Sequence, residues 1–169
     1  VPVNSTMHPD EVRRALWIAE PDAVVSEESW GGQPMIAPHE LRADGDAPCA
    51  PVTSDTPAYA VFTSGTTGDP KLCFHTHGDP GVYEQAIGSV IGLTPDDVTF
   101  SVSRMYFAYG LGNSLFFPLH RGGTTVLSRE RVTEDDALRI VKTHGVTVFY
   151  GQPSFYARLL RHPDHGLLS

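Results

Sequence analysis

Apolar residues recur at helical spacing near the start of the chain. Pro9 is followed, at intervals of three and four residues, by Val12, Ala15, Leu16 and Ala19. This spacing places the apolar side chains on one face of a helix, and proline suits the first helical position because its missing N–H needs no partner there. The pattern predicts an amphipathic helix that starts at Pro9 and ends before Pro21.

The next part of the chain changes from apolar to turn-rich. Ala23, Val24 and Val25 form a short apolar run of the kind found in strands. From Ser26 to Pro57 the sequence is rich in glycine, proline, serine and acidic residues. Such residues favour turns over regular elements, so we interpret this stretch as a long surface connection.

From Ala58 onward, short apolar runs alternate with helical patterns. The apolar runs, each predicted to be a strand, are 58–62, 72–75, 98–102, 124–127 and 146–150. The helical patterns lie around Tyr83 to Val90, in Gly110–Leu119, after the capping-box sequence Thr133-Glu134-Asp135-Asp136, and from Pro153 to Arg161. The alternation predicts an α/β fold: a mostly parallel sheet flanked by helices in αβα layers, with ligands at the carboxyl ends of the strands.

Composition and charge narrow the classes of function. The chain has 169 residues, 40% of them hydrophobic, and a net charge of -8, which fits one globular domain and argues against a nucleic-acid partner. The start has no basic segment followed by an apolar one, and no apolar run is long enough to span a membrane. Two cysteines, Cys49 and Cys73, make neither a disulfide framework nor a CxxC pair, so we expect a cytoplasmic protein.

The segment from Phe62 to Lys71, Phe-Thr-Ser-Gly-Thr-Thr-Gly-Asp-Pro-Lys, is a candidate phosphate-binding loop. Gly65 and Gly68 let the backbone approach an anion closely, four hydroxyls supply neutral donors, and Lys71 supplies positive charge. A polar turn between two strands is the alternative, because the same residue types favour ordinary turns. The P-loop of nucleotide hydrolases is excluded, because it needs glycine before the lysine and Ser or Thr after it.

A second candidate segment combines aromatic residues with glycines after a predicted strand. Its sequence from Met105 to Asn113 is Met-Tyr-Phe-Ala-Tyr-Gly-Leu-Gly-Asn. The glycines free the backbone, and the aromatic faces could line a pocket. The alternative is an aromatic core cluster beside a tight turn.

The ten residues from Phe62 to Lys71 resemble the signature phosphate loop of the adenylate-forming superfamily, which includes acyl- and aryl-CoA ligases, luciferases and peptide-synthetase adenylation domains. One departure is Leu72, where the family usually has glycine. The resemblance implies that the β- and γ-phosphates of ATP are held by Thr63, Ser64, Gly65, Thr66, Thr67, Gly68 and Lys71. Among these, Lys71 and Thr63 are the residues expected to act in catalysis.

The second segment resembles that of benzoate-CoA-ligase-like members, in which Phe-Ala-Tyr-Gly stands where many relatives have His, two residues and Gly. The resemblance places Phe107 at the usual His position, near the acyl carboxylate and the thioester passage. It places Ala108, Tyr109 and Gly110 along the acid pocket. An aromatic wall favours a flat aryl carboxylate over a long alkyl chain, although a small aliphatic acid would also fit.

The family's reaction implies the substrates and cofactors: a carboxylic acid, ATP, CoA and Mg²⁺. Later family segments, a Tyr-Gly-x-Thr-Glu stretch and a small C-terminal domain with a catalytic lysine, are not found before Ser169. We therefore expect a fragment of the N-terminal ATP- and acyl-binding domain, inactive by itself. Within it, residues 1–57 form a leading βα piece with a long loop, and residues 58–169 form the core with both motifs.

Three alternatives stay open. A carrier-protein thiol could replace CoA as the acyl acceptor, since the first half-reaction is the same. A non-catalytic nucleotide- or acyl-binding module could retain the loop. His75 and His77 lie two residues apart, so on a strand they would share a face as a metal pair, but no third ligand is apparent and no metal site is predicted.

Overall fold

The computed structural model describes residues 1–4, 6–41, 48–63 and 70–168. The chain forms two compact units, Val1–Thr76 and His77–Ser169, and each is considered by itself. Within the described ranges, no helix combines the length and apolar character needed to cross a membrane. The second unit contains the parallel sheet and its covering helices, so the α/β fold expected from the sequence is confirmed.

The first unit opens with α1 (Pro9–Ala19), which begins at the predicted proline. His8 caps the helix: its ring accepts a hydrogen bond from the N–H of Asp10, and the Glu11 carboxylate accepts one from the N–H of His8 at 2.8 Å. This reciprocal arrangement satisfies N–H groups that the first turn leaves without intrahelical partners. Val12 and Ala15 are buried, so the apolar face that the spacing predicted faces protein.

The apolar run at Val24 and Val25 forms a strand as predicted, and the turn-rich connection after it contains regular elements that the sequence did not predict. β1 (Val24–Val25) pairs in parallel with β2 (Met35–Ile36), and a short 3-10 helix, η1 (Pro38–Leu41), follows. The interpretation of this stretch as a plain surface connection was therefore wrong for residues 35–41. Strands of two residues are too short to show a periodic pattern, and their pairing depends on a partner elsewhere in the chain.

The first unit ends in an antiparallel hairpin of β3 (Pro57–Thr63) and β4 (Lys71–Thr76). The register is regular from Tyr59 opposite His75 to Thr63 opposite Lys71. The hairpin thus departs from the mostly parallel pairing of the fold. Antiparallel neighbours need only a short loop between them, and these two strands are consecutive in the chain.

The second unit is built on a three-stranded parallel sheet in the order β6 (Thr124–Val126), β5 (Val98–Ser101), β7 (Val148–Tyr150). All three strands fall within the predicted apolar runs. Their register places Phe100 beside Val126 and Phe149, and places Thr99 beside Thr125 and Val148. Because side chains alternate along a strand, these two sets lie on opposite faces of the sheet.

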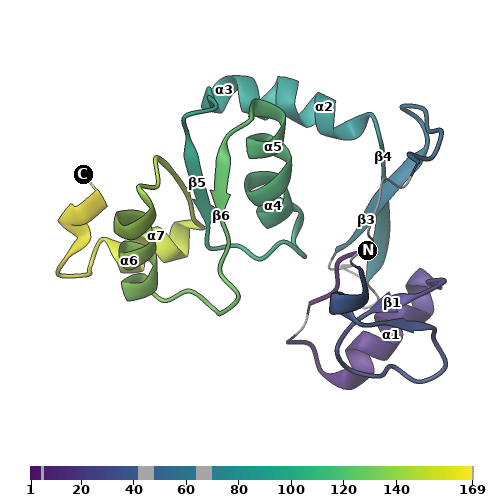
Figure 1. Cartoon of the computed structure of the whole chain (residues 1–169). Helices are drawn as coiled ribbons and strands as arrows, with labels where there is room; N and C mark the ends of the chain where they lie inside the picture. The colour runs from purple at the N-terminus through teal and green to yellow at the C-terminus, as the bar shows by residue number, and fades with distance from the viewer. Residues whose placement is uncertain (5, 42–47, 64–69, 169) are drawn as a thin grey trace. The chain divides into compact units, whose positions relative to one another are not determined.

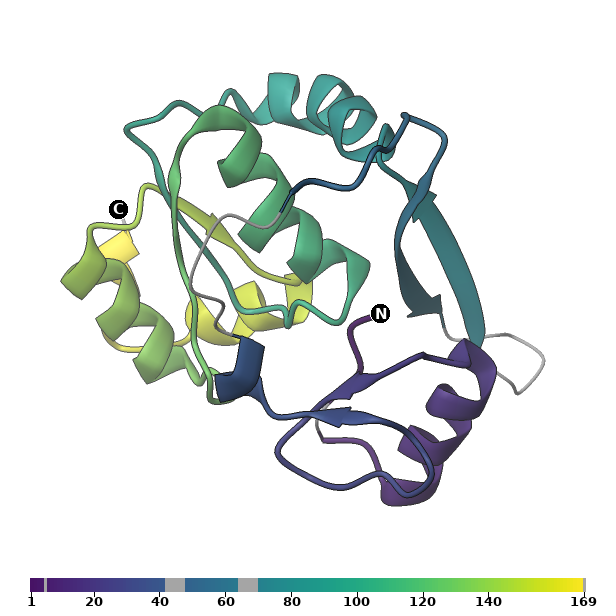
Figure 2. The same ribbon diagram turned by 45° about the vertical axis from the view of Figure 1, so that its right-hand side comes forward.

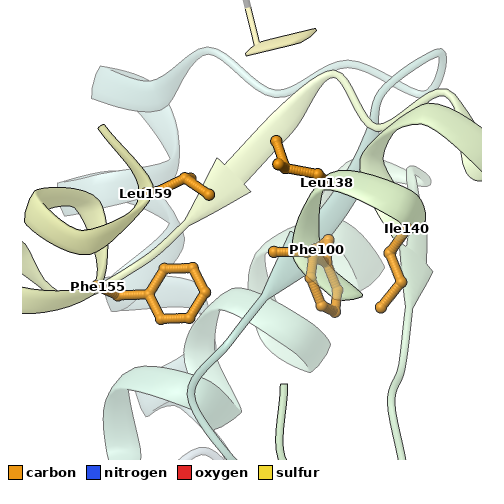
Figure 3. Packing of buried hydrophobic residues seen from close by; sticks show 6 residues of the cluster. Phe100, Leu138, Ile140, Phe155 and Leu159 are labelled. Atoms are coloured by element: carbon orange, nitrogen blue, oxygen red, sulfur yellow. The ribbon is translucent and has the colours of Figure 1, made fainter. Parts of the chain in front are cut away.

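One face of the sheet carries the main hydrophobic core (Figure 3). Two helices cover this face: α6 (Glu134–His144) and α7 (Pro153–Leu159). The buried cluster consists of Phe100, Ala137, Leu138, Ile140, Phe155 and Leu159. Thr133 and Asp136 form the predicted capping box of α6, and Gly145 ends that helix in the left-handed region at φ 61°.

Another helical layer covers the opposite face (Figures 1 and 2). It runs through α4 (Ala108–Leu111), the π-helix η3 (Gly112–Phe116) and α5 (Phe117–Arg121). Beside it lie α2 (Asp79–Tyr83), the π-helix η2 (Glu84–Gly88) and α3 (Ser89–Ile91). Glu84 forms an ion pair with Arg121, and the rings of Tyr83 and Phe116 lie 6.5 Å apart, so the two helical runs pack together.

Candidate functional site

The described ends of the candidate phosphate loop meet across the hairpin. Thr63 and Lys71 are directly opposite each other in the antiparallel register. The Thr63 hydroxyl donates to the Lys71 carbonyl at 3.4 Å and lies 3.8 Å from the sulfur of Cys73. Directly opposed residues project on the same face of a hairpin, so the hydroxyl and the ammonium share one side. Both residues are exposed, which leaves them accessible to a ligand.

The middle of that loop lies outside the described residues. This applies to the predicted phosphate-binding residues Ser64, Gly65, Thr66, Thr67 and Gly68. Their role stays a prediction from the sequence. Leu72, the departure from the family pattern, pairs with Phe62 in an unbroken register, so the leucine is accommodated as an ordinary strand residue.

His75 and His77 do not share a strand face. β4 ends at Thr76, so His77 follows the strand, while His75 stacks on Tyr59 with ring centroids 4.7 Å apart. Among the described residues, no group of three or more histidines, cysteines, aspartates or glutamates could hold a metal ion. The two histidines thus do not lie together on one strand, and His75 has an aromatic partner.

The second candidate segment folds into the first turn of α4. Phe107 is the N-cap residue, in extended conformation at φ -95° and ψ 141°, and its ring lies 4.6 Å from that of Tyr106. Ala108 opens the helix, two residues earlier than the predicted glycine-opened segment. Phe107 is 53% exposed and Tyr109 48% exposed, so both aromatic rings offer surface to a ligand.

Gly110 is required by close backbone approach. It is buried, and a Cβ at this position would lie 2.1 Å from the carbonyl oxygen of Arg104 and 2.6 Å from that of Ser103. Backbone atoms cannot yield as a flexible side chain can, so glycine alone lets α4 pack this closely on the segment after β5. The structure thereby fixes where the first turn of α4 begins.

Arg104 ties the same segment to the loop after β6. Its guanidinium donates to the carbonyl oxygen of Ser128 at 3.2 Å and to that of Arg129 at 2.5 Å. The Arg104 carbonyl accepts from the N–H of Phe107 at 3.1 Å. Arg104 therefore connects the carboxyl ends of two neighbouring strands to the residue that caps α4.

A group of tyrosines surrounds the end of β7. The Tyr109 hydroxyl donates to the Gly151 carbonyl at 3.5 Å, and the Tyr156 hydroxyl donates to the Phe149 carbonyl at 2.8 Å. Burial, and next the neighbouring Tyr109 phenol, raise the pKa of Tyr150 to about 12 and also raise the pKa of Tyr156. Both phenols are therefore neutral near pH 7, and the Tyr156 hydroxyl acts as a hydrogen-bond donor.

The sequence motifs did not identify Arg104, Tyr150 or Tyr156 as neighbours of the Phe-Ala-Tyr-Gly segment. Tyr150 and Tyr156 come from β7 and α7, 39 and 45 residues along the chain from the end of α4. The only signal available was the expectation that ligands bind at the carboxyl ends of strands, where Tyr150 stands. A search of the residues at the carboxyl end of each predicted strand would have found Arg104 and Tyr150, but not Tyr156, which lies further on in α7.

Comparison with known proteins finds a matching family model and similar ligases. The family model described as AMP-binding enzyme matches residues 1–168. The p-hydroxybenzoic acid–AMP ligase of Mycobacterium tuberculosis is 45% identical over 111 residues. The 4-hydroxybenzoate–CoA/benzoate–CoA ligase of Rhodopseudomonas palustris is 42% identical over 120 residues.

Structural comparison agrees with the sequence comparison. A benzoate CoA ligase from Burkholderia xenovorans matches 96% of this chain with a TM-score of 0.82 and 28% identity. The chain spans 36% of that structure. It spans 16% of the length of the Mycobacterium relative, with 65% of the chain matched, and 22% of the Rhodopseudomonas relative, with 71% matched.

Proposed function

Because the chain belongs to the AMP-binding enzyme family, we propose that the protein activates a carboxylic acid with ATP and then transfers the acyl group to CoA. In the first step a carboxylate oxygen attacks the α-phosphorus of ATP, the bond to the β-phosphate breaks, and pyrophosphate leaves. In the second step the CoA thiol loses its proton, its sulfur attacks the acyl carbon, and AMP leaves.

The observation that carries this proposal is the register that sets Thr63 opposite Lys71. It closes a loop rich in hydroxyls and glycine and puts a cation and a hydroxyl on the same side of the hairpin. The first step brings two anions together, so donors and positive charge around the phosphates lower its barrier. We assign Lys71 and Thr63, with Ser64, Gly65, Thr66, Thr67 and Gly68, to the β- and γ-phosphates.

We assign the acyl group to the first turn of α4. Phe107 and Tyr109 present exposed rings, Ala108 adds little bulk between them, and Gly110 fixes the turn. Flat aromatic surfaces stack favourably on an aromatic ring, which supports an aryl acid of the benzoate kind as the substrate. The named relatives, a hydroxybenzoate and a benzoate ligase, support the same substrate class.

Mg²⁺ is the usual companion of ATP, because it neutralises phosphate oxygens. Among the described residues, however, no cluster of acidic or imidazole side chains could hold a metal ion. The described residues thus do not provide a protein-held magnesium site, and no step of the proposed mechanism is assigned to the ion.

Titration of the intact protein with ATP tests the role of the hairpin. Lys71→Ala should weaken ATP binding roughly ten- to a hundredfold, because a charge-assisted hydrogen bond contributes about 1.5–3 kcal/mol. Lys142→Ala removes an exposed lysine of α6 and serves as the matched control. Equal ATP affinity in the two variants would contradict the assignment of Lys71.

The acyl acceptor is decided by a separate experiment. A carrier-protein thiol is the second candidate, because one relative is named as an acid–AMP ligase. Thioester formation by the intact protein should be compared with CoA and with a phosphopantetheinylated carrier protein. If the acyl group is transferred faster to the carrier protein than to CoA, the carrier protein is the acyl acceptor. If the intact protein binds neither ATP nor benzoate, the chain would instead belong to a non-catalytic module.

We also propose a cytoplasmic location. Both cysteines described, Cys49 and Cys73, are exposed free thiols, and thiols persist in a reducing compartment. Cell fractionation of the producing organism, with the protein detected by antibody, would test this part of the proposal.

A further inference from the structure

The two faces of the parallel sheet differ in polarity. Phe100, Val126 and Phe149 belong to the hydrophobic core on the face covered by α6 and α7. The opposite face, which we name the polar face, carries Thr99, Ser101, Thr125 and Tyr150 together with Val148, as the register and the alternation of side chains require. The helical layer α4–η3–α5 covers the polar face (Figure 1).

Buried polar atoms gather on this face. Within the described ranges, four buried side-chain atoms have no hydrogen-bond partner in the protein: Thr99 Oγ1, Asn113 Nδ2, Thr125 Oγ1 and Tyr150 Oη. Three of them come from the polar face itself, and Asn113 comes from η3, the π-helix that packs against β5 and β6. The concentration of all four in one layer indicates a shared cause.

These atoms are enclosed as well as unpartnered. Thr99 is fully buried, Asn113 is 4% exposed and Tyr150 is 8% exposed. Leaving a buried donor or acceptor without a partner costs about 1–3 kcal/mol, so several such groups side by side would be a severe cost. An enclosed atom can be reached only by a molecule small enough to fit inside the fold.

Water fits these requirements. A buried water molecule commonly makes about three hydrogen bonds to polar groups that the protein leaves unsatisfied. Threonine and tyrosine hydroxyls both donate and accept, and the asparagine amide nitrogen donates. Thr99 and Thr125 are register neighbours on adjacent strands, so one molecule between them can bond both hydroxyls.

We propose that the polar face binds internal water, held between β5, β6 and η3 by Thr99, Thr125 and Asn113, with Tyr150 as a further partner near the strand ends. This water lies under the helical layer α4–η3–α5, on the face of the sheet opposite the main hydrophobic core. The π-helical geometry of η3 fits this site, because wide turns of this kind recur where a helix accommodates a functional constraint. This proposal does not depend on the proposed enzymatic reaction.

The substitution Thr99→Val in the intact protein distinguishes a hydroxyl that holds a water molecule from one that has no partner, because the melting temperature should change in opposite directions. Valine has the shape of threonine without the hydroxyl. If the hydroxyl holds a water molecule, its loss removes hydrogen bonds and the melting temperature should fall by about 2–5 °C. If the hydroxyl is simply unsatisfied, its removal relieves a cost and the melting temperature should stay equal or rise.

Two controls accompany this measurement. Thr124→Val changes an exposed threonine of β6 and should leave the melting temperature within about 1 °C. Thr99→Ser keeps the hydroxyl and should retain the bound water. A crystal structure of the intact protein should show a density peak within hydrogen-bonding distance of the Thr99 hydroxyl and of either Thr125 or Asn113. Absence of that peak, or an unchanged or raised melting temperature for Thr99→Val, overturns the proposal.

Discussion

The hairpin β3–β4 and the helix α4 hold their candidate ligand-binding residues by different means. In the hairpin, backbone pairing sets Thr63 opposite Lys71, and both side chains are exposed. In α4, the first turn depends on the carbonyls of Ser103 and Arg104 on one side and on the Gly151 carbonyl on the other. The comparison teaches that the hairpin tolerates changes of side chain, whereas α4 depends on packing.

The largest expected effect on stability comes from Gly110→Ala, which disrupts the packing of α4. The added methyl would lie 2.1 Å from a backbone oxygen, so α4 must move or the turn must open. Overpacking of this kind costs about 3 kcal/mol or more in the free energy of unfolding. Urea unfolding of the intact protein measures this cost.

Gly81→Ala is the matched control for that substitution. Gly81 also lies in a helix, α2, but nothing stands within 4 Å of its added Cβ. Alanine favours helix by up to about 1 kcal/mol, so stability should stay equal or increase. Similar stability losses at both glycines would show that α4 is no more constrained than an open helix.

An intermediate effect is expected from Tyr109→Ala, which removes part of the proposed acyl wall. Loss of an aromatic contact costs about 1.5 kcal/mol, so benzoate should bind roughly tenfold more weakly, while ATP affinity should not change. Lys71→Ala should show the reverse pattern. Isothermal titration with each ligand measures both, and parallel losses of ATP and benzoate affinity in either variant would break the distinction between the two regions.

Tyr109→Phe refines the same prediction. It keeps the ring and removes only a hydrogen bond of 3.5 Å, at the weak end of the accepted range. Benzoate affinity should therefore remain within about twofold of the original. If Tyr109→Phe lost as much benzoate affinity as Tyr109→Ala, the hydroxyl and not the ring of Tyr109 would be the group that binds benzoate.

The smallest expected effect is on the pH dependence of stability, through Asp97 beside the parallel sheet. Hydrogen bonds from the Thr147 hydroxyl at 2.7 Å, and from the N–H and hydroxyl of Thr94, lower the pKa of Asp97 below its ordinary value of 3.8. A lowered pKa contributes stability that is present above pH 3.8 and lost as the pH falls through the lowered pKa. Asp97→Asn should therefore be less stable at pH 7, and the difference should shrink below pH 3.8.

Urea midpoints between pH 7 and pH 3 measure this narrowing, with Asp96→Asn, an exposed neighbour, as the control. A stability difference between Asp97→Asn and the original that stays constant over this range would show that the charge of Asp97 makes no contribution. The prediction would then fail even though the hydrogen bonds are present.

Several elements could be predicted from the sequence because their signals are local. The starts of α1 at Pro9 and of α6 after Thr133 follow from proline and from a capping box. The strands of the parallel sheet follow from apolar runs, and so do the two strands of the hairpin, although their antiparallel pairing was not predicted. Each of these signals depends on residues within a few positions, so no knowledge of distant neighbours is needed.

Other features could not be predicted, because they depend on distant neighbours. The strand β2 was missed because its pairing with β1 spans a turn-rich segment. The glycine-opened segment began at Ala108 and contained a π-helix, which no spacing rule anticipates. The roles assigned to Ser64, Gly65, Thr66, Thr67 and Gly68 stay predictions, because these residues lie outside the described ranges.

By itself, the sequence determined the α/β character of this chain, the ends of its main helices and the positions of two candidate motifs. Periodicity and turn chemistry act over a few residues, so they leave a readable pattern. Only the tertiary structure decided why Gly110 must be glycine, which tyrosines surround the end of β7, and which face of the sheet is polar. Those facts arise when segments tens of residues apart pack against one another, and close packing couples positions that no local pattern connects.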